Sequence, residues 1–358
     1  MAVHPPRQPS GQRDTGPLGL RVGEIVEVRS EEEVLATLDE HGRLDALPFM
    51  PEMLQFCGRR FRVHRRAITL CDTINSTGMK RMHEAVHLEG LRCDGSGHGG
   101  CQAGCLLYWK EAWLKRVPPE QAEDRVSYVR APAQRLPASA GEERPTCTTA
   151  TLMAATRAGG RRGTADEEVF ACQATELDKA APEHIDWWDV RQYVRDVRAG
   201  NAPPMRMLRS GLIMLFNKFQ SANRKFLPGL LLIRNGRNYP FVDGKLARTP
   251  REVLNLQPGE LVQIKTKDEI VRTLDRNNTN RGLSFDTEML KYCGRRTRVL
   301  RRVERIIDEK TGLMLRLAGD CIILDGVVCT ADYNQYCPRG IYPYWREIWL
   351  RRVEEPSG

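Results

Sequence analysis

The sequence contains one segment twice, and this repeat limits the chain to folds in which a single module occurs in two copies. Residues 23–117 align with residues 259–353 without a gap, at a constant offset of 236. Of the 95 aligned positions, 33 are identical. An ungapped match of this length indicates a tandem duplication. We therefore predict two homologous modules, separated by about 140 residues.

Composition and local spacing divide the 358-residue chain into six parts. The Pro-, Gly- and Ala-rich segment after the first copy predicts a linker, and helical apolar spacing in 187–198 and 205–219 predicts a partly helical insert. The expected parts are a disordered leader (1–19), a first β module (20–117), a flexible linker (118–164), the insert (165–255), a second β module (256–353) and a tail (354–358).

Each copy has the pattern of a small, mostly β unit. The alternating runs Gly23–Arg29 and Gly259–Lys265 predict an opening strand. The apolar spacing of Glu31–Leu38 and Lys267–Leu274 predicts one short helix in each copy. Asp308–Gly312 has the composition of a turn between two strands. The predicted fold class is therefore α+β, mostly β with an α insert.

Two resemblances accompany these patterns. The size of each copy, its short strands and its opening Gly-Glu-Ile-Val-Glu-Val resemble SH3-like or KOW-type barrels, which implies two small SH3-like β modules. The strings CGRR, CIILDGVVC and YWREIWL also resemble those of uncharacterised bacterial proteins, some encoded near biosynthetic genes. The second resemblance implies no particular activity and no site residues.

The composition is that of a soluble globular protein with a basic surface. The net charge is +9, and 28% of the residues are charged. No apolar stretch approaches the eighteen or more residues of a membrane span, and the N-terminus lacks the apolar core of a secretion signal. We therefore expect a cytoplasmic protein without membrane association. The excess of basic residues is compatible with a protein partner or with nucleic acid, whose phosphates such residues neutralise.

The eleven cysteines give the strongest site signal. Clustered cysteines in a reducing compartment indicate metal or redox chemistry, and four thiolates complete a tetrahedral zinc site. We predict one zinc site in each copy. The expected ligands are Cys57, Cys93, Cys101 and Cys105 in the first copy, and Cys293, Cys321, Cys329 and Cys337 in the second.

Three alternatives to these zinc sites stay open. An iron–sulfur cluster would use the same four thiolates. His83, His87 and His98 offer nitrogen ligands in the first copy, where the second has other residues. Buried reduced cysteines can also simply fill space in a core.

Arginine and tryptophan residues occur at matching places in both copies. The pairs Arg59-Arg60 and Arg295-Arg296 are candidate nucleic-acid or anion ligands, or else they belong to a solvated strand face. The matched pairs Trp109/Trp113 and Trp345/Trp349 favour core packing over base stacking. In that interpretation Glu111 and Glu347 each pair with an arginine.

The insert offers a catalytic alternative. Cys147 is expected at a helix N-terminus, where the helix dipole lowers the pKa of a thiol, and His184 could act as its base. Cys172 could pair with Cys147 as a redox couple. The sequence contains no Gly-rich phosphate loop, His-Glu-x-x-His or Gly-x-Ser-x-Gly motif, so the commonest enzyme signatures are absent.

These observations favour binding over catalysis, without excluding an enzyme. The predicted function is that of a metal-binding adaptor or accessory protein with two modules and a basic binding face, with zinc favoured over iron–sulfur. The alternatives are an iron–sulfur or thiol-dependent redox enzyme of a biosynthetic pathway, and a nucleic-acid-binding protein.

Overall fold

The computed structural model describes residues 17–118, 147–157, 168–224, 226, 228, 232–333 and 336–354. Residues 1–16 of the expected leader, most of the expected linker and residues 355–358 lie outside this part of the chain. The fold is mixed α+β and rich in antiparallel strands, as the sequence predicted. Within the described residues, no helix combines the length and apolar character that crossing a membrane requires.

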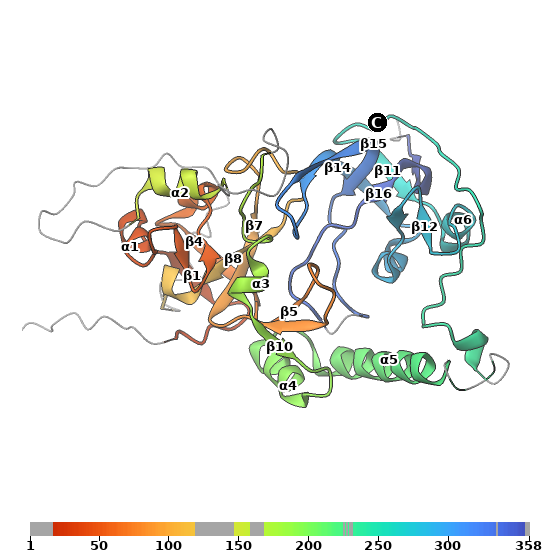
Figure 1. Ribbon diagram of the computed structural model, residues 1–358, viewed down its shortest axis with the longest axis horizontal. Helices are drawn as coiled ribbons and strands as arrows, with labels where there is room; N and C mark the ends of the chain where they lie inside the picture. Colours follow the sequence, from red (N-terminus) through yellow and green to blue (C-terminus); the bar gives the residue numbers. More distant parts are fainter. Residues whose placement is uncertain are drawn as a thin grey trace, which may run out of the picture.

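Each repeat forms a five-stranded antiparallel sheet. The first repeat forms the left lobe of Figure 1, and the second repeat forms the right lobe. The first repeat contains β1 (Ile25–Val28), α1 (Glu31–Leu35), β2 (Arg43–Leu44), β3 (Leu47–Pro48), η1 (Pro51–Phe56), β4 (Arg60–Arg66), β5 (Thr69–Cys71), β6 (Met79–Arg81), β7 (Ala85–Arg92), β8 (Leu106–Lys110), η2 (Glu111–Trp113) and β9 (Leu114–Arg116). The second contains β11 (Leu261–Ile264), α6 (Lys267–Val271), β12 (Thr279–Asn280), β13 (Leu283–Ser284), η6 (Thr287–Tyr292), β14 (Arg296–Ile307), β15 (Met314–Leu324), β16 (Trp345–Arg346), η7 (Glu347–Trp349) and β17 (Leu350–Arg352).

The two sheets have equivalent strand orders and registers. The orders are β8-β7-β4-β1-β9 and β16-β15-β14-β11-β17. Ile25 pairs with Arg62 in the first sheet, and Leu261 pairs with Arg298 in the second, at the sequence offset of 236. The duplicated sequence therefore produces the same backbone pairing in both copies.

The tryptophans of each repeat form the centre of its core. Trp109, Trp113, Trp345 and Trp349 are all fully buried. Phe49 packs edge to face on Trp113, with ring centroids 5.1 Å apart, and Phe285 packs in the same way on Trp349, with ring centroids 5.4 Å apart. Such pairs contribute about 0.5–1.5 kcal/mol each beyond the area they bury. The prediction that these residues pack in the core is confirmed.

Matching capping boxes begin the short helices. The Ser30 hydroxyl accepts a hydrogen bond from the Glu33 N–H, and the Glu33 carboxylate accepts one from the Ser30 N–H; Thr266 and Glu269 repeat this arrangement at α6. Both reciprocal bonds satisfy N–H groups that the first turn leaves without partners. The helices are present as predicted and end three residues earlier than expected.

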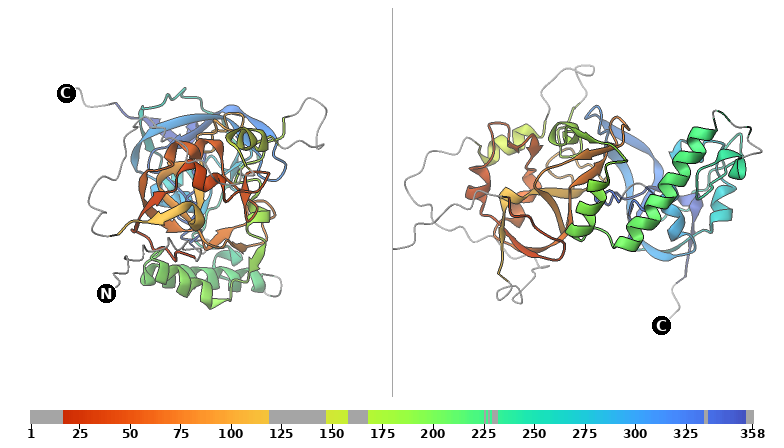
Figure 2. Two further views of the ribbon diagram at one scale, coloured as in Figure 1. Left: turned by 90° about the vertical axis from the view of Figure 1, so that its left-hand side faces the viewer. Right: turned by 90° about the horizontal axis from the view of Figure 1, so that it is seen from below.

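The insert contributes helices and one strand. Its elements are α2 (Thr149–Ala155), α3 (Leu177–Ala180), β10 (Glu183–Ile185), α4 (Val190–Ala199), α5 (Pro204–Asn223) and η5 (Ile233–Gly236). The two longer helices confirm the prediction from apolar spacing, and Gly200, with φ of 84°, ends α4 in the left-handed conformation that glycine favours. Figure 2 shows α4 and α5 together on one side of the molecule.

The two repeats contact each other through a hairpin of each at their junction. In the second repeat β14 and β15 form a long hairpin, and the Gln102 N–H of the first repeat donates to the Arg305 carbonyl at 3.0 Å. The aligned segment of the first repeat leaves its own sheet and forms β5 and β6, which pair with β10. This segment contacts the second repeat, where Arg339 donates to the Thr73 hydroxyl at 2.5 Å. Each repeat therefore contacts the cysteine-containing loop of the other.

Candidate metal centre

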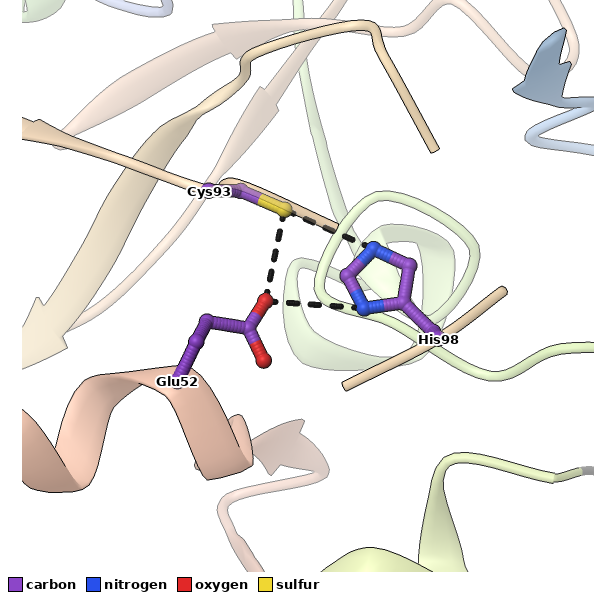
Figure 3. Close-up of side chains that lie close together, drawn as sticks. All are labelled: Glu52, Cys93 and His98. Atoms are coloured by element: carbon purple, nitrogen blue, oxygen red, sulfur yellow. Dashed lines mark hydrogen bonds and ion pairs between the residues drawn. The ribbon is translucent and has the colours of Figure 1, made fainter. Parts of the chain in front are cut away.

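Among the described residues, three possible metal ligands converge at one place, formed by Glu52, Cys93 and His98. Glu52 lies on η1, Cys93 directly follows β7, and His98 lies on the loop between β7 and β8 (Figure 3). The Cys93 N–H donates to the Cys105 carbonyl at 2.8 Å, which closes the loop at its base. The three side chains therefore come from two separate segments of the first repeat.

Two glycines allow this loop to fold against Glu52. Gly95 has a φ of +77°, and a Cβ there would lie 2.2 Å from the Cys101 carbonyl oxygen. A Cβ on Gly97 would lie 2.5 Å from Oε2 of Glu52. A larger residue at Gly95 would force apart the two ends of this loop, and one at Gly97 would push the loop away from η1, since real Cβ contacts are not that short. The loop CDGSGHGGC thus brings its histidine to the glutamate because its glycines leave the necessary space.

The three residues lie close enough to share a metal ion, since one ligand atom from each lies within 4.8 Å of the other two. Cys93 Sγ lies 3.3 Å from Glu52 Oε1 and 3.4 Å from His98 Nε2, while His98 Nδ1 lies 3.5 Å from Glu52 Oε1 (Figure 3). Zinc bonds of about 2.3 Å to sulfur and about 2.0–2.1 Å to nitrogen or oxygen place neighbouring ligand atoms about 3.3–3.6 Å apart. The two distances from Cys93 Sγ fall in this range, with Nε2 as the ligand atom of His98. Sulfur, imidazole nitrogen and carboxylate oxygen are all zinc ligands.

The site is buried, and its polar atoms are only partly satisfied. The side chains of His98 and Glu52 are 2% and 1% exposed. Glu52 Oε2 and His98 Nδ1 have no hydrogen-bond partner among the described residues. An unsatisfied buried polar atom costs about 1–3 kcal/mol, so a metal ion that satisfied part of this group would stabilise the folded protein.

Burial also shifts the pKa of each group in the direction that favours the neutral form of its side chain. Desolvation raises the pKa of Glu52, and desolvation followed by the charge of Glu52 raises that of Cys93. Desolvation lowers the pKa of His98 to about 4. The histidine is therefore neutral, its metal-binding form, at neutral pH. A bound cation would favour the ionised thiolate and carboxylate through its own charge.

The same three residues are also arranged as in a thiol triad, with one imidazole nitrogen facing the thiol and the other facing a carboxylate. A nucleophilic cysteine needs a lowered thiol pKa, however, and here burial and the nearby Glu52 raise it. Metal binding fits this electrostatic environment better than nucleophilic catalysis does.

The other predicted ligands of the first repeat lie around this group rather than in it. Cys57 ends η1 and packs against the core. Cys101 and Cys105 line an adjoining cavity of about 50 Å³, together with Cys93 and Cys172. Cys101 Sγ accepts a hydrogen bond from the Ile307 N–H of the second repeat at 3.4 Å. The described residues thus contain no four-thiolate centre in this repeat, because its cysteines face different surroundings.

The four predicted thiols of the second repeat are divided among three places. Cys293 packs against the core of that repeat, and Cys321 lies on β15 beside Arg346. Cys329 and Cys337 lie in a third cluster, which they share with Cys71 of the first repeat. The four-thiolate arrangement expected from the sequence is therefore not formed by the described residues of this repeat either.

The glutamate of the site was not identified from the sequence, whereas His98 was among the alternative nitrogen ligands. A signal for Glu52 existed, because Glu-Met-Leu occurs at 52–54 and again at 288–290. Both glutamates are buried. A carboxylate repeated within an apolar segment is unusual enough to indicate a defined partner. The other candidate nitrogens do not join the site: His83 contacts Glu183, and His87 contacts the Leu107 carbonyl.

The catalytic candidates of the insert do not come together. Cys147 directly precedes the N-cap Thr148 of α2, as expected, but burial raises the pKa of its thiol instead of the helix lowering it. Burial likewise raises the pKa of Cys172, to about 12. His184 lies on β10 and contacts the Thr77 carbonyl. Within the described residues, no hydrogen bond joins any two of these three side chains.

The arginines of the repeated CGRR strings contact residues of their own repeats. Arg59 lies over the rings of Phe56 and Phe61, Arg60 pairs with Glu27 at 3.1 Å, and Arg295 lies over Tyr292. Arg296 begins β14 and is exposed. Further along the same strands, Arg66 and Arg302 bind the buried Glu111 and Glu347, which confirms the expected pairing of those glutamates.

The chain matches no protein-family model, no curated protein and no solved structure.

Proposed function

We propose that this protein binds one zinc ion in its first repeat, through Cys93, His98 and Glu52. The observation that carries the proposal is that one ligand atom from each of these three residues lies within 4.8 Å of the other two. Cys93 Sγ lies 3.3 Å from Glu52 Oε1 and 3.4 Å from His98 Nε2. The two orphaned polar atoms of Glu52 and His98 support it. Three protein ligands leave one position for a further donor, such as water or a thiol of the adjoining cavity.

The second repeat provides the contrast. Glu288 and Cys329 align with Glu52 and Cys93, but the aligned position of His98 is Asn334, which lies outside the described residues. Glu288 Oε1 accepts a hydrogen bond from the Tyr333 N–H at 2.6 Å. We therefore propose one zinc ion per chain, rather than the one in each repeat expected from cysteine counting.

The curled five-stranded sheets support the SH3-like interpretation of both repeats.

The metal proposal is tested by elemental analysis of protein purified without oxygen and without added metal. We expect about one zinc per chain, in line with the one ligand group that the described residues form. Cys93→Ser and Glu52→Gln should remove most of it. The matched variants Cys329→Ser and Glu288→Gln should retain it. Equal loss in both pairs, or no metal in the parent protein, would overturn the proposal.

A visible spectrum separates zinc from the iron–sulfur alternative. Zinc has no redox chemistry and a filled d shell, so the zinc-loaded protein should be colourless. Iron with labile sulfide and a broad band near about 400 nm would indicate a cluster of the kind that cysteine thiolates hold. That outcome would replace the zinc proposal with a redox function.

A second candidate function, binding of a protein partner, rests on α5. Its exposed apolar side chains recur at intervals of three and four residues and so form one stripe: Met205, Leu208, Leu212, Leu215 and Phe219. The helix also lines a groove of about 560 Å³ with Tyr239 and Phe241. Its charged residues, Arg206, Arg209 and Lys218, are all basic. We propose that the occupant is an acidic amphipathic helix of a partner, since a second copy of α5 would bring like charges together.

This candidate is tested with a fluorescent 21-residue peptide of Leu/Glu heptads, using anisotropy. We expect saturable binding that weakens about tenfold in Leu212→Asp and is unchanged in Val253→Asp, a control at an exposed apolar residue outside α5. Binding to anionic vesicles without peptide binding would assign the stripe to a membrane surface and overturn the proposal. Concentration-dependent dimerisation through α5 would assign it to a second copy.

Nucleic-acid binding remains a prediction from the basic composition. It requires affinity that falls steeply with salt and weakens when Arg59, Arg60, Arg295 and Arg296 become Ala. The cytoplasmic location also remains a proposal, supported by eleven cysteines that are all thiols in the structure.

A further inference from the structure

Two equivalent contacts join the repeats at their junction. The Cys71 N–H of the first repeat donates to Cys337 Sγ of the second at 3.2 Å. The Ile307 N–H of the second repeat donates to Cys101 Sγ of the first at 3.4 Å. Cys71 aligns with Ile307, and Cys101 aligns with Cys337, at the offset of 236. The two halves of the molecule therefore contact each other reciprocally, as subunits do across a two-fold axis.

The two contacts differ in one side chain. At the first contact residue 71 is a cysteine, and its Sγ lies 3.0 Å from Cys337 Sγ. At the second contact residue 307 is an isoleucine, which packs with Cys101 and Phe170 in an apolar cluster. Only the first contact thus brings two thiols together across the repeats. The separation is about 1 Å longer than a disulfide bond of about 2.05 Å, so a small shift suffices to form one.

The surroundings of Cys71 activate its thiol. The Cys337 thiol donates a hydrogen bond to Cys71 Sγ, and this bond, with the nearby Arg339 charge, outweighs burial and lowers the pKa of Cys71 to about 7. Arg339 is held in place by Glu309 at 2.9 Å and by Thr73 at 2.5 Å. Cys71 is half-buried, whereas Cys337 is buried. Cys71 is therefore the thiol that an oxidant reaches, and Cys337 the one that resolves the intermediate.

We propose that Cys71 and Cys337 form a reversible disulfide that covalently joins the two repeats. The oxidant is a low-molecular-weight disulfide of the glutathione class. The Cys71 thiolate attacks one of its sulfurs, releases one thiolate and forms a mixed disulfide. Cys337 then gives up its proton and attacks Cys71 Sγ, and the second thiolate leaves. Two protein thiols are oxidised and one small disulfide is reduced to two thiols.

The neighbouring thiols are less reactive. Burial raises the pKa of Cys105 to about 11, and that of Cys172 and Cys329 to about 12. Because the thiolate is the attacking species, these cysteines react slowly at neutral pH. The Cys71–Cys337 pair should accordingly oxidise before the thiols around the candidate metal centre.

The test is peptide mapping of the reduced full-length chain after incubation in glutathione redox buffers. Free thiols are trapped with N-ethylmaleimide before digestion. We expect the first cross-linked peptide to join Cys71 to Cys337, and dithiothreitol to reverse it. The oxidised protein should unfold at a temperature several degrees higher, since the bond closes a very long loop. Fully oxidised protein without this peptide, or with Cys71 recovered as a stable glutathione adduct, would overturn the proposal.

The repeat supplies matched variants. Cys71→Ile introduces the residue of the second contact and should abolish the cross-link while the fold is kept, as far-UV circular dichroism would check. Ile307→Cys should create a second cross-link, to Cys101. Cys337→Ala should slow alkylation of Cys71 by iodoacetamide at pH 7 several-fold, because the hydrogen bond that lowers its pKa is lost. An unchanged alkylation rate would contradict the role assigned to Cys337.

Discussion

The two repeats share a scaffold and differ in the chemistry they place on it. Both keep the buried tryptophans, the capping boxes and a buried glutamate that binds an arginine. The first repeat adds a Glu–Cys–His group, whereas Glu288 of the second binds the backbone of Tyr333. Residues that hold the sheet are thus common to both copies, and residues at the junction differ. Among the described residues, the duplicated module thus supports a group of possible metal ligands in the first copy alone.

The largest effect is expected at the shared glutamates. Glu347 accepts hydrogen bonds from the N–H groups of Leu254, Asn255 and Leu256 and from Arg302, and Glu111 binds Gly19, Leu20 and Arg66 in the same way. Replacing either by Ala removes the carboxylate that an arginine and several N–H groups share as their partner. We expect each variant to lose about 3–5 kcal/mol of unfolding free energy in urea titrations.

The conservative replacements refine this comparison. Glu111→Gln and Glu347→Gln keep the shape of the side chain, so they should lose less unfolding free energy than the Ala variants do. Although burial acts to raise it, Arg302 and the backbone N–H groups lower the pKa of Glu347 overall. The stability from this carboxylate is therefore present at neutral pH and lost as the pH falls through its folded pKa. If replacing one of the two glutamates lowered the unfolding free energy and replacing the other did not, the two scaffolds would not be equivalent.

His98→Asn gives the first repeat the residue that the second has at this position. Removing a direct ligand should weaken zinc binding by about 100-fold or more, since even outer partners of metal ligands contribute about 10–100-fold. Competition with a chromophoric chelator measures this change. Unaltered affinity would remove His98 from the site and would make the two repeats alike in metal binding.

The sequence predicted the scaffold better than the site. Periodicity and capping patterns are local, so α1, α4, α5 and α6 could be predicted from neighbouring residues alone. The position of each cysteine depends instead on how the repeats pack against each other, which places Cys71 against Cys337, 266 residues away. Counting thiols within one copy could not reveal that contact. Glu52 is repeated as Glu288, but its role as a partner of Cys93 and His98 depends on how η1 packs against the loop after β7, which the local sequence does not contain.

The docking of the insert is a further difference, because α4 packs on β4 of the first repeat. Asn201 at the end of α4 donates to the Asp196 carboxylate at 2.7 Å and accepts from the Arg66 N–H at 2.8 Å. Burial raises the pKa of Asp196 to about 6. The folded state therefore binds this proton more tightly than the unfolded state, and stability falls as the pH rises from about 4 to about 6.

Asp196→Asn should remove that pH dependence and stabilise the protein at pH 7 by about 1–2 kcal/mol. This is below the roughly 3 kcal/mol that two pKa units represent, because the amide is itself buried. Thermal unfolding at pH 4.5 and pH 7 measures both effects. A destabilised variant at pH 7 would mean that the charged carboxylate holds α4 against the first repeat.

The smallest effect is expected at Glu27, which pairs with Arg60 at 3.1 Å on the first sheet, with both side chains about one-third exposed. The second sheet has Gln263 at the aligned position, where its amide donates to the Gly294 carbonyl. Glu27→Gln therefore makes the first strand resemble its counterpart and should cost no more than about 0.5 kcal/mol, with the difference shrinking at high salt. Urea titrations at 50 mM and 500 mM salt test this. A loss above about 2 kcal/mol would mean that the first sheet depends on an ion pair that the second does without, and that the two scaffolds have diverged in their stability as well as in their chemistry.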